Sequence, residues 1–169
     1  HFMLEKRFGK LKRQTMPYTH AGIQIERLSK DTIRLHQDHF CSKLTTINIG
    51  KHRIDEPESD LDAAESTTFR SLTCGALWAT QTNPQELCQI TTLQQSLKKP
   101  QVKHLMEINT VIKRLKAPNR EKFGIWFRRL SPPYRIFSVS DASSANKRSD
   151  YAKEGIAGLL GEDRVFDLN

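Results

Sequence analysis

The stretch that decides how the C-terminal part of this chain folds is Tyr134-Arg-Ile-Phe-Ser-Val-Ser-Asp141-Ala-Ser-Ser144. Its mainly alternating apolar and polar residues are typical of a short β-strand. The strand places a carboxylate at Asp141 and is followed by small residues. Because a turn-forming aspartate after a strand has the same appearance, only the surrounding sequence can show whether Asp141 has a chemical role.

Two further runs with a period of two lie on either side of this strand. Residues 124–130 precede it across a Ser-Pro-Pro turn, and residues 154–160 follow a polar loop. We therefore expect an antiparallel meander of three strands. Its uncovered faces should leave apolar side chains such as Leu159 and Leu160 exposed.

Three helical segments come before these strands, and together they predict a small bundle with one apolar stripe on each helix. Ser66 is a possible N-cap of the first helix. Asn83-Pro84-Gln-Glu86 is a start signal for the second, which Pro100 ends, and the third runs from about residue 101 to 117. The side chains expected in the core are Phe69, Leu72, Ala76, Leu77, Trp78, Leu87, Ile90, Leu93, Leu97, Val102, Leu105, Met106, Ile108, Ile112, Leu115 and, from the later strands, Trp126.

The N-terminal part has the pattern of a β-hairpin with one buried face, formed by residues 21–28 and 32–35. A basic amphipathic stretch, residues 2–13, precedes it, and a helix is expected from His36 to about Ile47. Residues 50–62 contain Pro57, most of a cluster of acids and no apolar period. Such charge runs are usually solvated linkers.

The resulting fold class is α+β. We expect a β-hairpin and a small helical bundle, followed by an incomplete antiparallel sheet. The corresponding regions are residues 1–49, an acidic linker at 50–65, the bundle at 66–118 and the C-terminal strands at 119–169.

The charge of the chain favours a polyanionic partner. The net charge is +8, and residues 51–65 hold six of the 19 acidic residues, so the remainder is still more basic. Such a field favours nucleic acid over a neutral substrate, although a protein that is basic only for solubility would show the same total. No apolar run approaches the roughly 20 residues of a membrane span, so we expect an intracellular protein without a membrane partner.

The three cysteines, Cys41, Cys74 and Cys88, form no C-x-x-C pair and are odd in number. They indicate a reducing compartment and small buried side chains rather than a disulfide framework. A zinc site formed by His36, His39 and Cys41 is the alternative. It lacks a fourth ligand from a second Cys/His pair.

Seven sequence blocks, taken in order, resemble the C-terminal part of the polymerase polyprotein of copia-like LTR retrotransposons. That family has F-L-G-I-x-I, I-x-L-x-Q, Y-R-S-L-x-G-x-L-x-Y, T-R-P-D-I, R-x-L-x-Y-L-K, G-L-x-Y and S-D-A-D-W-A. The order and spacing of the blocks cover almost the whole chain, whereas no single block is decisive. The corresponding blocks are Ala21-Gly-Ile-Gln-Ile25, Ile33-Arg-Leu-His-Gln37, Phe69-Arg-Ser-Leu-Thr-Cys-Gly-Ala-Leu-Trp78, Thr82-Asn-Pro-Gln-Glu86, Ile112-Lys-Arg-Leu-Lys116, Gly124-Ile-Trp-Phe127 and Ser140-Asp-Ala142.

The resemblance implies the end of a reverse transcriptase palm, a primer-grip hairpin, a thumb, a connection and the first strands of ribonuclease H. Asp141 would then be the first metal-binding carboxylate of ribonuclease H, which uses several acids to hold two metal ions. The family's Y-V-D-D polymerase turn does not occur in this sequence. We therefore expect a fragment that is inactive alone and has no cofactor of its own, with Mg²⁺ bound at Asp141 only in the full-length parent.

Three departures separate this chain from the family pattern and suggest a divergent element. Ser143-Ser144-Ala145 replaces the residues around the family's Trp-Ala. The T-R-P-D block has lost its Arg and Asp, and Asn146-Lys-Arg-Ser-Asp150 replaces an acidic run. The last two changes remove charges that the family keeps.

The partners expected from the resemblance are an RNA/DNA hybrid or template-primer and the remainder of the polyprotein. Phosphate contacts need long cationic side chains without base-specific geometry, and the thumb helices carry several, although a solvated helix face would also carry them. Gln37 and Arg70 match family motif positions, so they would touch the template-primer or brace the thumb. The expected phosphate-binding residues are Lys98, Lys99, Lys103, Lys113, Arg114 and Lys116.

Two other functions fit the sequence. One is a non-catalytic module that binds a protein through the exposed face of its bundle. The other is an active nuclease that uses Asp141 with Asp150 and Glu154. Glu154 is otherwise expected to be a solvent-facing residue next to a strand.

Overall fold

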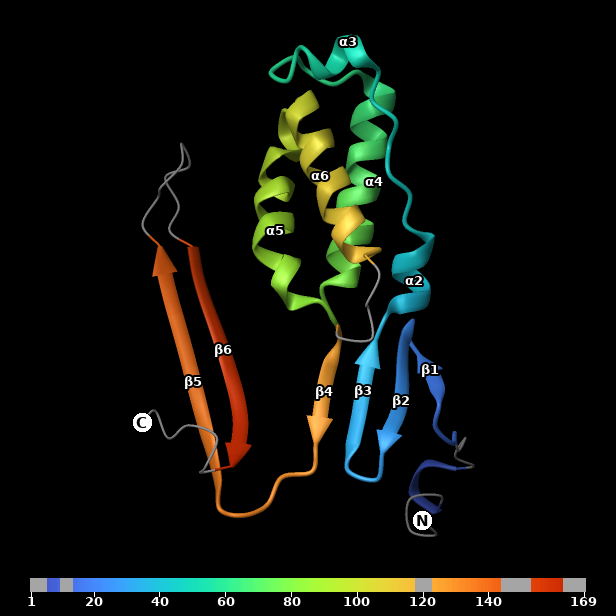
Figure 1. Ribbon diagram of the computed structural model, residues 1–169, viewed down its shortest axis with the longest axis vertical. Helices are drawn as coiled ribbons and strands as arrows, with labels where there is room; N and C mark the ends of the chain where they lie inside the picture. Colours follow the sequence, from blue (N-terminus) through green and yellow to red (C-terminus); the bar gives the residue numbers. More distant parts are fainter. Residues whose placement is uncertain (1–5, 10–13, 118–122, 144–152, 163–169) are drawn as a thin grey trace. The chain divides into compact units, whose positions relative to one another are not determined.

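The computed structural model describes residues 6–9, 14–117, 123–143 and 153–162. It confirms the expected α+β class: a four-stranded antiparallel sheet, three main helices and a two-stranded antiparallel sheet (Figure 1). The chain divides into two compact units, His1–Phe127 and Arg128–Asn169. Each unit is described by itself.

The first sheet has the strand order β1-β2-β3-β4. The predicted hairpin is present, with Ile25 opposite Leu35, and a short strand that the sequence did not reveal pairs with it. The predicted three-strand meander is wrong, because β4 joins this first sheet beside β3. The strands are β1 (Tyr18–His20), β2 (Ile23–Ser29), β3 (Thr32–His36) and β4 (Ile125–Arg128).

The buried face of the hairpin is polar, not apolar. On β3 the buried side chains are Arg34 and His36, whereas Ile33 and Leu35 are only half-buried. The alternation predicts the strand correctly, but the more buried face carries Arg34 and His36 and not the apolar residues. The reason is that Arg34 and His36 both contact carboxylates, which offsets the cost of burying polar groups.

Gly124 permits the close approach of β4 to β3. Its φ is +116°, and a Cβ at this position would lie 2.6 Å from the backbone oxygen of Leu35. Residues with a side chain rarely adopt this conformation. The glycine therefore allows β4 to pair beside β3 where the chain returns from the bundle.

The bundle consists of α4 (Ala63–Ala79), α5 (Leu87–Gln95) and α6 (Val102–Leu115), with short 3₁₀ turns at Pro84–Glu86 and Ser96–Lys98. Most of the predicted core residues are confirmed, including Cys41 and Leu44, which were also expected to be buried, and Ala79 and Val111 join them. Four of the predicted core side chains are instead partly exposed: Leu87 (43%), Met106 (38%), Trp78 (38%) and Trp126 (39%). The fully or almost fully buried side chains from the predicted set are Phe69, Ala76, Ile90, Leu93, Val102, Leu105, Ile108, Ile112 and Leu115.

Helix α4 begins earlier than expected, because Asp62 and not Ser66 is its N-cap. The Asp62 carboxylate accepts a hydrogen bond from the Glu65 backbone (2.7 Å), and Glu65 accepts one from the Asp62 backbone (3.0 Å). This reciprocal pair is a capping box. At the next helix start, the Asn83 side chain donates to the Ala79 carbonyl oxygen (2.7 Å), and Pro84 opens a 3₁₀ turn instead of an α-helix.

The helix after β3 is shorter than predicted. It ends at Lys43 (α2, Asp38–Lys43), and a second short helix, α3, covers Lys51–Ile54. Between them the chain is held against α6 by Asn109, whose side chain both accepts from the Ile47 backbone nitrogen (2.9 Å) and donates to the Ile47 carbonyl oxygen (2.8 Å).

The acidic segment is not a simple solvated linker, although most of its side chains are exposed. Its backbone is bonded to the start of α6: Leu61 to Pro100 (3.1 Å) and Val102 to Ser59 (3.1 Å). Since α4 also begins here, acidic residues lie beside the N-termini of two helices, where negative charge is stabilising. The hydrogen bond from Arg53 (2.6 Å) also lowers the pKa of Glu65.

The second unit contains β5 (Tyr134–Ser143) and β6 (Lys153–Glu162). They pair antiparallel, from Tyr134 opposite Glu162 to Ser143 opposite Lys153. The expected exposure of Leu159 and Leu160 is confirmed at 50% and 60%. The predicted amphipathic stretch 2–13 and the loop 144–152 lie mostly or wholly outside the described residues.

The cysteines are free, but only Cys41 is the buried side chain that we expected. Cys74 and Cys88 are exposed because they lie on the outer faces of α4 and α5. The expectation of three small buried cysteines is therefore wrong for two of them.

His104 makes the stability of the bundle depend on pH. Burial lowers its pKa below the ordinary value of 6.5, and its Nδ1 accepts the Gln101 backbone N–H (2.9 Å) at the start of α6. The unfolded chain thus binds the proton more readily, so stability is full above about pH 6.5 and falls as pH decreases. One proton accounts for at most about 1.4 kcal/mol per pH unit.

We expect His104→Gln to remove this component, because a Gln at this position keeps the acceptor of a capping box without titrating. Urea unfolding of both proteins between pH 7.5 and 5.5 measures the difference. The assignment to His104 fails if the two proteins lose stability equally over this range.

Candidate functional site

The cations predicted to bind nucleic acid, including Arg70, fall into two groups. Four of them, Arg70, Lys98, Lys99 and Lys113, have exposed side chains on the bundle. They are free to meet a ligand from solvent. Lys99 directly precedes Pro100, whose carbonyl oxygen accepts a hydrogen bond from the Leu61 backbone nitrogen (3.1 Å).

The other three cations are engaged within the protein. Lys103 Nζ lies 2.6 Å from Glu58 Oε2, and Arg114 Nη2 lies 2.6 Å from the nearly buried Glu86. Lys116 Nζ donates to the Leu44 carbonyl oxygen (2.7 Å). The hydrogen bond to Glu86 raises the pKa of Arg114 further. These residues stabilise the fold, and binding a phosphate would require them to give up a partner.

Gln37 is fully buried, so it is not placed to touch a template-primer. Its Oε1 accepts a hydrogen bond from Thr82 Oγ1 (3.0 Å), which joins the end of β3 to the end of α4. Of the two roles expected for Gln37, the structure supports bracing. Thr82 and Asn83, which begin the block that resembles T-R-P-D, are buried at this contact.

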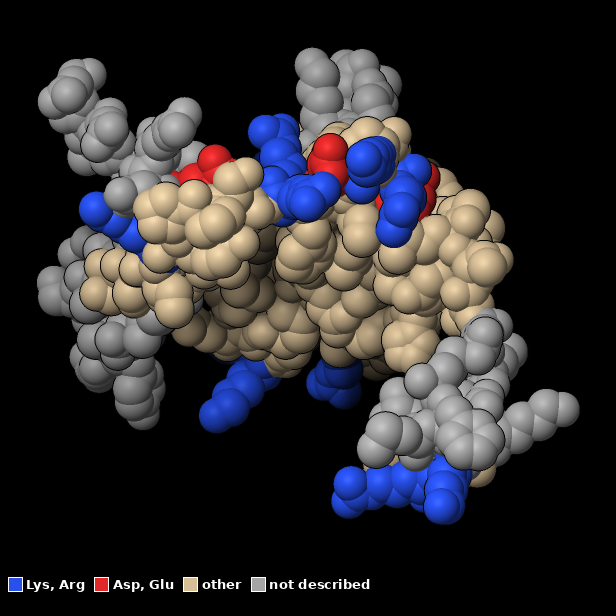
Figure 2. All heavy atoms as spheres, turned by 90° about the horizontal axis from the view of Figure 1, so that it is seen from below, with Lys and Arg blue, Asp and Glu red and all other residues tan. Residues whose placement is uncertain are grey.

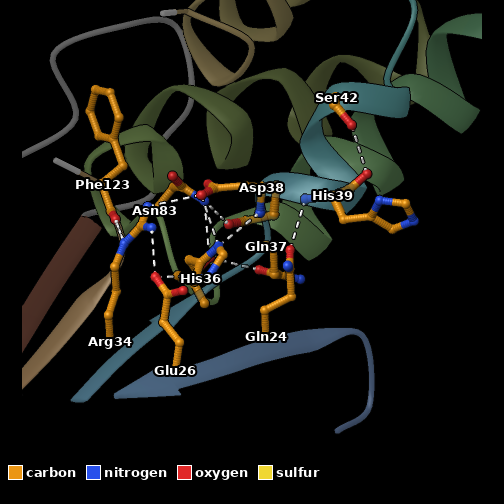
Figure 3. Close-up of polar contacts among 12 residues, drawn as sticks. Gln24, Glu26, Arg34, His36, Gln37, Asp38, His39, Ser42, Asn83 and Phe123 are labelled. Atoms are coloured by element: carbon orange, nitrogen blue, oxygen red, sulfur yellow. Dashed lines mark hydrogen bonds and ion pairs between the residues drawn. The ribbon is translucent and has the colours of Figure 1, made fainter. Parts of the chain in front are cut away.

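A polar junction lies beside Gln37 and connects four parts of the first unit (Figure 3). Its centre is Arg34, which is 4% exposed. The guanidinium bonds Glu26 on β2 (3.1 Å), Asp38 on α2 (2.9 Å) and the Phe123 carbonyl oxygen before β4 (2.8 Å). It also lies 5.9 Å from the centre of the Trp126 ring, within the range of a cation–π contact.

His36 completes the polar junction. Its Nδ1 lies 2.8 Å from Asp38 Oδ2, and its Nε2 lies 3.4 Å from Glu26 Oε1, without the geometry of a hydrogen bond. The side chain also lines a cavity of about 230 Å³ between β1 and β2. Glu26 lies opposite Arg34, and His36 lies two residues after Arg34, so the spacing on the hairpin indicates a shared polar face. The apolar residues of the hairpin, by contrast, predict that the opposite face is buried.

The zinc alternative is not supported by the part of the chain that the structure describes. No three His, Cys, Asp or Glu side chains there are grouped to hold a metal ion. His36 is instead occupied by two carboxylates with Arg34 between them, and a cation at the same place would be repelled by that guanidinium. Cys41 is buried in the core with Phe69 and Leu105.

Asp141 lies on β5, with Gly155 opposite it on β6. Glu154 is opposite Ala142, so the two acids occupy register positions of opposite parity, and Asp150 lies outside the described residues. The backbone therefore does not bring Asp141 and Glu154 to one face of the pleat. The described residues supply no set of carboxylates that fits the two magnesium ions implied by the resemblance.

The viewed surface carries both basic and acidic side chains. Figure 2 shows Lys and Arg side chains projecting at several places on the face that it views, with Asp and Glu among one group of them. None of the described helices combines the length and the apolar character needed to cross a bilayer.

Comparisons with family models, curated proteins and solved structures find no match to this chain.

Proposed function

We propose that this chain is part of a copia-like retrotransposon reverse transcriptase and ribonuclease H polyprotein, in which it contributes surface that binds the backbone of an RNA/DNA hybrid. The seven ordered sequence blocks support the family assignment. The hairpin, the helices and the β5–β6 pair follow each other along the chain in the order expected for this anatomy, although β4, which the resemblance assigns to the later strands, pairs in the first sheet. The chain supplies binding surface, and its described residues do not group into a complete metal site.

The observation that supports the binding function is that some of the predicted cations are exposed without an ion-pair partner among the residues that the structure describes, whereas others are paired with carboxylates. Arg70, Lys98 and Lys99 are exposed and make no ion pair with another described residue, whereas Lys103 and Arg114 are neutralised by carboxylates. Exposed cations attract a polyanion over long distances, and counterion release from the phosphates then drives binding. Such binding has little sequence preference.

The test is the salt dependence of binding to a labelled RNA/DNA hybrid, measured by fluorescence anisotropy between 50 and 300 mM KCl. Each phosphate contact contributes about 0.9 to the slope of log affinity against log salt. We expect the double variant Lys98→Ala, Lys99→Ala to lower the magnitude of this slope by up to about two. Hybrids of unrelated sequence should behave alike.

Lys103→Ala is the matched control, because it removes a nearby lysine that already has a carboxylate partner. Its slope should equal that of the unmodified chain. Binding that does not weaken with salt, or equal effects of the double variant and the control, would contradict the proposed function.

A further inference from the structure

We infer that a groove between α6 and the α2–α3 segment binds an extended peptide that carries an apolar side chain followed three residues later by a carboxylate. The groove has a volume of about 350 Å³. It lies within the first unit. The proposal does not depend on nucleic-acid binding, although the groove includes Lys113, one of the exposed cations described above.

One wall of the groove is a single stripe of α6. Met106, Asn109, Thr110 and Lys113 line it, and their spacing of three or four residues places them on one face of the helix. The opposite wall is formed by Asn48, Ile49 and Ile54.

The start of the second wall is held against α6 beside the groove. The two hydrogen bonds between Asn109 and the Ile47 backbone (2.8 and 2.9 Å) tie the second wall to α6. A preformed site of this kind loses little conformational freedom on binding.

The groove presents both apolar and polar side chains and is open to solvent. Met106 is 38% exposed and Ile54 is 42% exposed, although most apolar side chains of α6 are fully buried in the core. Covering these two side chains with an apolar group removes both from water, which is favourable. Met also adapts its shape to different apolar partners.

The positive charge of the groove predicts that its ligand carries an anionic group. Lys113 is the only charged side chain that lines it among the described residues, and it is exposed. It lies seven residues after Met106, which is about 10.5 Å along the helix at 1.5 Å per residue. The complementary ligand therefore has an anionic group roughly 10 Å from its apolar group.

An extended peptide meets this spacing. In a polyproline II conformation, side chains three residues apart lie on the same side and about 9 Å apart. Nucleic acid is a poorer fit, because backbone tracking uses several cations and bases stack on aromatic rings. The lining of the groove has a single lysine and no aromatic side chain.

The probe is the peptide acetyl-Ser-Leu-Pro-Pro-Glu-Ser-amide, in which the prolines favour the extended conformation, together with its counterpart carrying Lys in place of Glu. Each is titrated to several millimolar into the ¹⁵N-labelled full chain and followed by NMR. We expect the Glu peptide to shift the amide signals of Met106 and Thr110. The Lys peptide should bind more weakly.

Lys113→Glu should weaken binding of the Glu peptide about three- to tenfold and strengthen binding of the Lys peptide. The matched control, Lys98→Glu, makes the same charge change on an exposed lysine outside the groove and should change either affinity less than twofold. Because the charge swap is made in both partners, a folding defect cannot imitate the expected reversal.

Four results would overturn the peptide groove. These are equal responses of the two lysine variants, equal binding of the two peptides, and no shift at several millimolar peptide. The fourth is a shift of the same amides by a 12-residue oligodeoxythymidine instead of the peptide, which would assign the groove to nucleic acid.

Discussion

Arg34→Met is expected to destabilise the first unit by about 3–5 kcal/mol, the cost of leaving one side of a buried ion pair without its partner. The guanidinium is 4% exposed and holds Glu26, Asp38 and the Phe123 carbonyl oxygen. The methionine fills similar space but makes none of these bonds. The Glu26 and Asp38 carboxylates, whose side chains are 31% and 28% exposed, and the Phe123 carbonyl oxygen then lose this partner.

Urea unfolding followed by tryptophan fluorescence measures this loss, since both tryptophans lie in the first unit. Arg27→Met is the control, because Arg27 is exposed on the neighbouring strand, and it should change stability by no more than about 0.5 kcal/mol. Similar midpoints for the two variants would show that the polar junction contributes little.

Gly124→Ala is expected to destabilise the first unit by about 2–5 kcal/mol. A φ of +116° is strained for any residue with a side chain, and the new Cβ would meet the Leu35 backbone oxygen at 2.6 Å. Backbone strain contributes about 1–3 kcal/mol. The overlap adds a further cost of about 1–3 kcal/mol, because a carbonyl in a sheet cannot move aside as a flexible side chain can.

Gly22→Ala separates the two contributions to the Gly124 effect. Gly22 also has a positive φ, +76°, but its added Cβ would lie at an ordinary 3.5 Å from Trp78. Gly22→Ala should therefore lower the free energy of unfolding only by the cost of backbone strain, about 1–2 kcal/mol. If urea unfolding gives equal losses for the two alanine variants, the close approach between β4 and β3 does not limit what residue 124 can be.

Local patterns were sufficient to predict most elements of this fold. The alternation in residues 21–35 and the apolar stripes of the three helices each depend on neighbours within a few residues. Strand pairing does not. β4 has the pattern of a strand, but its partner β3 lies about 90 residues earlier, and nothing within 124–130 distinguishes that partner from the adjacent β5.

The candidate binding residues show the same division between local and distant information. The sequence identifies a cation such as Arg114 or Lys116, but not its partner at Glu86 or at the Leu44 carbonyl oxygen, 28 and 72 residues away. Exposure of a cation is therefore not evident from its position on a helix. The sequence does not reveal the groove for the same reason, since the place of Met106 in the apolar stripe of its helix predicts a buried side chain, whereas it is 38% exposed.

The pairing of β3 with β4 makes the helical bundle an insertion between two neighbouring strands of one sheet. The chain leaves the sheet at His36 and re-enters it at Gly124, where the backbone of one strand nearly touches the other. An insertion with adjacent ends can be removed, with a short turn in its place, without changing the order of the strands. The sheet and the bundle nevertheless form one compact unit, and the hydrogen bond between Gln37 and Thr82 joins the end of β3 to the end of α4.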